Sequence, residues 1–110
     1  FNILVSNFDD HLRNHGFLLT NEGWKLSPAF DINPIETGTG LKLNISEDDN
    51  ALDINLAMEV YPYFRLTETK AKRIIEQVKN AVMMWRKVAE KYEISRTEQE
   101  LKASAFNVIN

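Results

Sequence analysis

The feature that most constrains the fold of this chain is a long amphipathic pattern that begins after Thr67. Its apolar residues recur at spacings of three and four over about seven helical turns, which is the period of one helix face. They are Ala71, Ile74, Ile75, Val78, Ala81, Val82, Trp85, Val88, Ala89 and Tyr92. Thr67 is a favourable N-cap residue. The pattern predicts one continuous helix to Tyr92, with its apolar face on a core or a partner and its charged face in solvent.

Two shorter helices are predicted on either side of it. Asp53 can cap a helix that Pro62 ends, and the apolar face of this helix carries Leu56, Ala57 and Val60. Ser95 and Glu98 have the spacing of a capping box, which predicts a last helix through Phe106. We therefore interpret residues 51–110 as a helical bundle, and nothing in them indicates chemistry.

The first third of the chain has a different character. Phe17–Leu19 and Trp24–Leu26 flank Thr20-Asn21-Glu22-Gly23, in which Asn and Gly supply the positive φ of a tight turn, so we expect a β-hairpin. Residues 32–50 indicate a loop, in which a short strand over Leu41–Ile45 is the one regular element we expect. The glycines of ETGTG within it match no phosphate-binding pattern, and a flexible loop is the better interpretation. The expected fold class is α+β, mainly α, in a single domain over residues 1–110.

Composition excludes several classes of protein. With 110 residues, 44% hydrophobic and 26% charged, the chain is an ordinary globular domain. A net charge of −3 gives no electrostatic footprint for nucleic acid. The absence of cysteine excludes disulfides and thiolate zinc sites and fits a reducing compartment, so we expect a cytoplasmic location. No apolar run approaches the roughly 20 residues that span a bilayer, and no signal peptide is recognisable.

The start of the chain is apolar and has no capping residue before it. The stretch FNILVSNF begins at Phe1, which we interpret as a chain cut within a helix and hence as the C-terminal piece of a larger protein. A processed natural N-terminus is the alternative.

Chemistry-bearing side chains gather directly after this stretch, in the segment VSNFDDHLRN. Asp9 and Asn14 lie five residues apart, and Asp31 follows the predicted hairpin. A hairpin brings its two ends together, so these three oxygen-bearing side chains can converge. Hard oxygen ligands suit Mg²⁺, which is held by one or two protein groups and by phosphate oxygens. A carboxylate off the metal can orient and deprotonate an attacking hydroxyl. The alternative is a set of turn and cap residues.

The order of these residues resembles a kinase catalytic loop, D-x-x-x-x-N, followed by a hairpin and a metal-binding Asp. More closely, D-D-H-L-R-N, the hairpin and L-S-P-A-F-D resemble the HipA-like serine/threonine kinases of bacterial toxin–antitoxin systems. Their catalytic loop reads D-x-H-x-K-N and their metal motif is close to L-x-P-x-Y-D. Arg13 stands where Lys is usual, and Phe30 where Tyr is usual. The resemblance implies the C-terminal helical lobe of a protein-kinase-like fold, with residues 1–34 carrying the specific motifs.

The resemblance also implies roles for individual residues. Asp9 would be the catalytic base or would orient the hydroxyl, and Asn14 and Asp31 would bind Mg²⁺ and, through it, ATP. His11 would support the loop as a hydrogen-bonded histidine. Two interpretations of Arg13 remain open. It neutralises charge on the transferring phosphoryl group, or it forms a surface salt bridge.

Two further residues of the loop have no role in this reading. We expect Asp10 to be exposed to solvent. We expect His15 to lie at the hairpin edge and not to act as a ligand.

The function implied is transfer of the ATP γ-phosphoryl group to a Ser or Thr hydroxyl of a protein, as the toxin of a toxin–antitoxin pair. In the family the targets include aminoacyl-tRNA synthetases, and a helix-turn-helix antitoxin is the restraining partner; no nucleic acid or membrane binding is expected. Because the nucleotide-covering lobe cannot lie in these residues, we expect the 110-residue chain alone to be inactive. Two alternatives remain, a lipid or small-molecule phosphotransferase and a non-catalytic interaction module whose long helix binds a partner.

Overall fold

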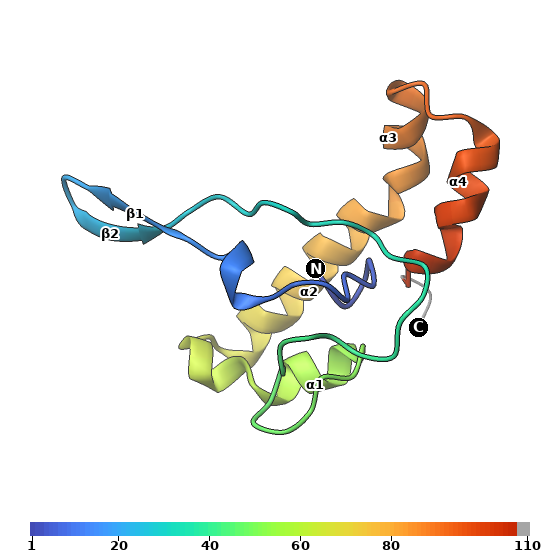
Figure 1. Ribbon diagram of the computed structural model, residues 1–110. Coiled ribbons are helices and arrows are strands. Elements are labelled where there is room, and N and C mark those ends of the chain that lie inside the picture. The colour runs from blue at the N-terminus through green and yellow to red at the C-terminus, as the bar shows by residue number, and fades with distance from the viewer. Residues whose placement is uncertain (108–110) are drawn as a thin grey trace.

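The computed structural model describes residues 1–107 and shows an α+β protein (Figure 1). Its hairpin and helices are, in chain order, β1 (Phe17–Thr20), β2 (Gly23–Leu26), α1 (Ile54–Glu59), α2 (Glu68–Met83), α3 (Trp85–Lys91) and α4 (Arg96–Lys102). Short 3₁₀ turns lie at Leu12–Asn14, Tyr61–Phe64 and Ala103–Ala105. The helices form the body, and the hairpin projects from it. No helix among the described residues is long and apolar enough to cross a membrane.

The predicted helix starts are confirmed by their capping bonds. The Asp53 carboxylate accepts from the amide of Asn55 at 2.8 Å, and the Thr67 hydroxyl accepts from the amide of Lys70 at 3.3 Å. Ser95 begins α4 with both bonds of a capping box. Each side chain satisfies an amide that has no partner within its helix.

The expectation of one continuous helix to Tyr92 is wrong, because the helix breaks at Met84. Met84 has ψ of 3°, and its amide bonds to the carbonyl of Ala81 at 3.2 Å, so the regular ladder is interrupted. The next residue, Trp85, stacks on Phe106 with ring centroids 4.1 Å apart. In Figure 1, α3 accordingly turns away from the axis of α2. Phe106 lies far from Trp85 in the sequence, so the spacing of apolar residues along the helix cannot predict this contact.

Three other expected elements also differ. The last helix ends at Lys102 and continues only as a 3₁₀ turn. No strand forms over residues 41–45, because that segment folds back on itself: the Leu41 amide bonds to the Asn50 carbonyl at 2.9 Å. The N-terminal segment forms turns and not a helix, since Ser6 adopts a positive φ of 51° directly after the first turn.

The hairpin is confirmed, with Phe17 paired to Leu26 and Thr20 paired to Gly23. Gly23 supplies the positive φ, 102°, whereas Asn21 does not adopt one, so that part of the turn prediction is wrong. The large side chains of both strands are exposed. The base of the hairpin is closed by a 2.8 Å bond from the Ser27 amide to the Gly16 carbonyl.

The centre of the core joins the start of the chain to α2. Leu4, Val5 and Val82 form a buried cluster, and Phe106 is among the residues packed against it. The Asn107 amide also bonds to the Leu4 carbonyl at 2.8 Å. The N-terminal segment is therefore anchored in the core immediately before the catalytic-loop motif begins.

Candidate active site

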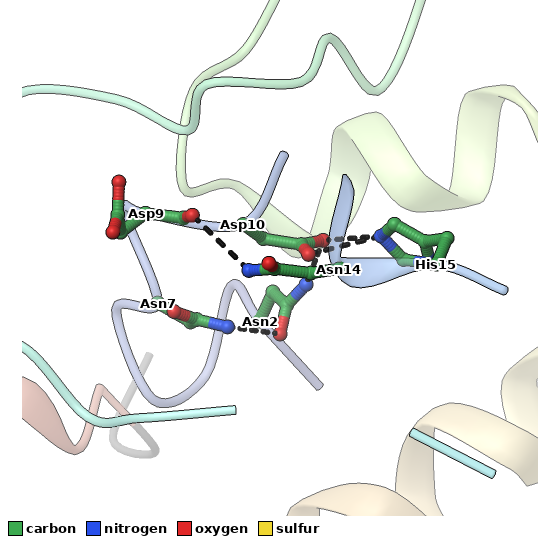
Figure 2. Close-up of polar contacts among 6 residues, drawn as sticks. All are labelled: Asn2, Asn7, Asp9, Asp10, Asn14 and His15. Carbon is green, nitrogen blue, oxygen red and sulfur yellow. Dashed lines mark hydrogen bonds and ion pairs between the residues drawn. The ribbon is translucent and has the colours of Figure 1, made fainter. Parts of the chain in front are cut away.

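Asp9 and Asn14 lie at the two ends of one tight turn (Figure 2). The Asn14 amide bonds to the His11 carbonyl at 2.8 Å, which forms the 3₁₀ turn Leu12–Asn14. The Asn14 side-chain nitrogen donates a long bond, 3.5 Å, to the Asp9 backbone carbonyl. Asn14 is buried, whereas the Asp9 side chain is 61% exposed. The turn thus presents an exposed carboxylate beside a buried amide.

The exposed Asp9 carboxylate is paired with Lys42, which comes from the long loop after the hairpin. The hydrogen bond from Lys42, and then its positive charge, lower the pKa of Asp9, with smaller contributions from His11 and Arg13. Lys42 contacts Oδ1, while Oδ2 accepts no hydrogen bond from residues 1–107. Asp9 is therefore an ionised carboxylate with one oxygen available to a ligand.

Asp10 is buried, and the expectation that it faces solvent is wrong. Its Oδ2 accepts from the Asn2 side chain at 2.7 Å, and His15 Nε2 lies 2.9 Å from Oδ1 and 3.1 Å from Oδ2. Figure 2 shows the Asp10 carboxylate pointing toward the His15 ring, while that of Asp9 points away from this network. The hydrogen bonds compensate the loss of hydration that burial of a carboxylate entails.

His11 and Arg13 lie within the turn, between Asp9 and Asn14. The Nδ1 atom of His11 is buried and has no hydrogen-bond partner among the described residues, so at this atom the structure does not show the hydrogen-bonded histidine that was expected. The backbone carbonyl of His11 supports the turn instead. Arg13 is exposed and forms no salt bridge within the part of the chain that the structure describes.

Asp31 lies beyond the base of the hairpin. It adopts a positive φ of 55°, and its Oδ1 accepts from the Asn33 side chain at 2.8 Å. The preceding Phe30 ring lies close to Gly16 at the hairpin base. The hairpin therefore returns the chain toward the Asp9–Asn14 turn, although Asp31 makes no hydrogen bond to Asp9 or Asn14 within residues 1–107.

The family model for the HipA-like C-terminal domain matches residues 1–85, which is more than three quarters of the chain. The chain belongs to this family. Searches of curated proteins and of solved structures found no significant match. The match includes the Asp9–Asn14 turn, the hairpin, Asp31 and α2, whereas α4 lies beyond it.

Asn14 and Asp31 carry oxygen atoms of the kind that Mg²⁺ prefers in proteins. The described residues contain no group of three or more His, Asp or Glu side chains that could hold a metal by themselves. Mg²⁺ commonly takes only one or two protein ligands and completes its shell with water and phosphate oxygens. Asn14 uses its side-chain nitrogen toward Asp9, which leaves its oxygen for such a role. Asn14 and Asp31 remain the predicted ligands.

The side-chain contacts of three residues of this HipA-like domain were not predicted from the sequence, namely those of Lys42, Asp10 and His15. Lys42 lies 33 residues from Asp9, in the 32–50 loop, within the stretch Leu41–Ile45 that was expected to form a short strand. That loop packs closely on the catalytic segment at Gly38, where an added Cβ would lie 2.5 Å from the Phe8 ring. The only available signal was a lone basic residue between two leucines. Asp10 and His15 carried a clearer signal, an acid and a histidine five residues apart across a predicted turn.

Proposed function

We propose that this domain carries the catalytic loop of a serine/threonine protein kinase, which transfers the γ-phosphoryl group of ATP to a Ser or Thr hydroxyl of a protein. The observation that best supports the proposal is the Asp9–Asn14 turn, because it pairs an exposed, ionised carboxylate with a buried, oriented amide. Phosphoryl transfer depends mainly on positioning of the reactants and on stabilisation of charge. The Asp9 carboxylate can position the attacking hydroxyl, and the Asn14 amide can help to hold the metal that stabilises the phosphate charge.

Each predicted residue has a distinct part in this reaction. Asp9 accepts the proton of the attacking hydroxyl through its available Oδ2, while Lys42 pairs with Oδ1 and lowers the pKa of the carboxyl. Asn14 and Asp31 would hold Mg²⁺, which when bound supplies neutralisation of the phosphate charge. Arg13, exposed on the same turn, adds positive charge near the transferring group.

Membership of the family extends the proposal to the biological setting. We assign the domain to the toxin component of a toxin–antitoxin pair in the cytoplasm. Its partners would be a protein substrate, such as an aminoacyl-tRNA synthetase, and a helix-turn-helix antitoxin. The reaction requires ATP and Mg²⁺, and the nucleotide-covering lobe that a kinase needs is not among these residues.

The test uses the full-length protein with Mg²⁺ and γ-labelled ATP, alone and with cell lysate. Asp9→Asn and Asp31→Asn are compared with wild type, and Asp48→Asn, an exposed loop carboxylate, is the matched control. We expect label on Ser or Thr in wild type and in the control, and none in the other two variants.

Other outcomes would redirect or end the proposal. Label found only in lipid or small-molecule fractions would keep the site and change the substrate class. No label from a folded protein that fails to bind ATP would overturn the kinase proposal and favour the non-catalytic interaction module.

A further inference from the structure

A buried carboxylate that the proposed reaction does not use lies at the centre of the catalytic loop. The Asp10 side chain is 11% exposed, against 61% for its neighbour Asp9. Burying a carboxylate is unfavourable unless donors replace its lost water. The two adjacent acids therefore have different environments, and we look for a different role for each.

The donors to Asp10 come from both sides of the loop. Asn2 donates from the core-anchored N-terminal segment at 2.7 Å, and His15 Nε2 contacts both carboxylate oxygens at 2.9 and 3.1 Å. Asn2 is itself held by the side chain of Asn7, which donates to it at 3.1 Å and is almost fully buried. Asp10 therefore links the core to the start of the hairpin.

The position of this contact in the chain connects it to the proposed site. Asp10 directly follows Asp9, and His15 directly follows Asn14. We propose that Asp10 and His15 form a positioning pair that sets the separation of the proton acceptor and the metal-binding amide. The pair acts through the backbone of the turn that it closes and touches neither substrate nor metal. This role rests on the proposed function.

A positioning role makes a different prediction from simple stabilisation. If the pair is lost, Asn14 shifts, so the Mg²⁺ concentration that gives half of the maximal rate rises as the rate itself falls. Supporting groups around metal ligands typically account for about 10- to 100-fold in activity or metal affinity. Partial unfolding alone would lower the rate and leave that Mg²⁺ concentration unchanged.

The experiment measures transfer of label from γ-labelled ATP by the full-length protein across a Mg²⁺ titration. Asp10→Ala and His15→Ala are each expected to lower the maximal rate about 10- to 100-fold and to raise the half-maximal Mg²⁺ concentration. The double variant should be little worse than either single one, because both remove the same contact. His15→Gln, whose side-chain amide can still donate to Asp10, should recover most of the rate.

A second readout does not depend on enzymatic activity. Amide hydrogen exchange should accelerate at Asn14 and His15, whose amides bond to the carbonyls of His11 and Leu12, in His15→Ala but not in His15→Gln. Because the His15 side chain is 44% exposed, its replacement preserves folding even if Asp10→Ala does not.

Glu68→Ala is the matched control, since it removes an exposed ion pair with Lys72 on α2. It should change neither the rate nor the exchange of the loop amides.

The outcomes separate the two proposals. If wild type transfers no label, the kinase proposal fails, and the exchange data alone decide the role of the pair. If amide exchange at residues 14 and 15 and the half-maximal Mg²⁺ concentration stay at wild-type values in His15→Ala, the pair does not position Asn14 and the inference is overturned.

Discussion

Adjacent carboxylates in one sequence motif have opposite environments in this protein. Asp9 is exposed and paired with a lysine from a distant loop, and Asp10 is buried between Asn2 and His15. Residue type therefore does not distinguish them, whereas their partners do. An exposed ionised acid can exchange its contacts for a substrate, and a buried one fully occupied by donors cannot.

The first prediction concerns the pKa of Asp9. Lys42→Met removes the hydrogen bond and the charge that hold this pKa below its ordinary value, so the pKa should rise. Its value in each protein can be followed by carbon NMR of the Asp9 carboxyl during an acid titration. In wild type, the stabilising contribution of the pair is present at neutral pH and is lost as the pH falls through the lowered pKa.

The matched control for that titration is Lys25→Met, which removes another exposed ion pair, with Glu22, on the hairpin. It should leave the Asp9 titration unchanged. An Asp9 pKa identical in wild type and Lys42→Met would show that the contact with Lys42 does not form in solution.

At this scale, sequence reasoning could find the reactive residue types but not their surroundings. The spacing of Asp9 and Asn14 indicated a turn, and the structure places them at its two ends. The burial of Asp10 depends on Asn2, eight residues earlier, and the pairing of Asp9 depends on Lys42, 33 residues later. Neither partner belongs to a local pattern with a defined geometry.

The helix termini show where local sequence is sufficient. The caps at Asp53, Thr67 and Ser95 were predictable because a cap is formed by residues two or three positions apart. The break at Met84 was not, because Met is a good helix former and the stack that follows the break joins Trp85 to Phe106. At Met84 the helix ends although the local sequence favours its continuation, and the tertiary stack of Trp85 on Phe106 lies at this break.

The second prediction tests the capping box of α4. Ser95→Ala removes the hydroxyl that accepts the Glu98 amide bond at 3.3 Å, so the free energy of unfolding should fall by about 1 kcal/mol. Urea unfolding followed by circular dichroism measures this change. Thr97→Ala, at an exposed position inside the same helix, should have an effect near zero or slightly stabilising. Equal losses in both variants would mean that the cap contributes nothing specific.

The third prediction concerns the stability of the hairpin. Two-stranded hairpins are marginal in water by themselves, and Leu19 and Trp24 on paired strands are each 69% exposed. In the 110-residue chain, the amides of β1 and β2 should therefore exchange with solvent faster than those in the middle of α2. Hydrogen exchange read by NMR compares the two directly. Equal protection would show that the hairpin packs against a surface, such as that of a second copy.

At the scale of the whole molecule, a large apolar cavity lies apart from the candidate site. A cavity of about 770 Å³ lies beside the helix break and is lined mainly by apolar side chains, including Val82, Trp85, Leu101 and Phe106. None of the predicted site residues lines it. Cavity size alone would therefore have directed attention away from the Asp9–Asn14 turn.

The buried core of the molecule is small and links the ends of the chain. Ten apolar residues are buried among those that the structure describes, and Leu4 is one of the most enclosed, at 2% exposure. Leu4 packs with Val5 and Val82, and its carbonyl accepts the Asn107 amide. The same segment leads directly into the Asp9–Asn14 turn, so the cluster around Leu4 also anchors that turn.

The last prediction follows from that arrangement. Leu4→Ala leaves a cavity between the N-terminal segment and α2, which should lower the free energy of unfolding by about 2 to 5 kcal/mol. Such a loss is a large part of the roughly 5 to 15 kcal/mol that stabilises a typical domain. Leu12→Ala makes the same chemical change at a side chain on the catalytic turn that is 76% exposed, and it should change stability by less than about 0.5 kcal/mol. Urea unfolding of both variants distinguishes the cases, and equal effects at the two positions would mean that the N-terminal segment does not pack on α2.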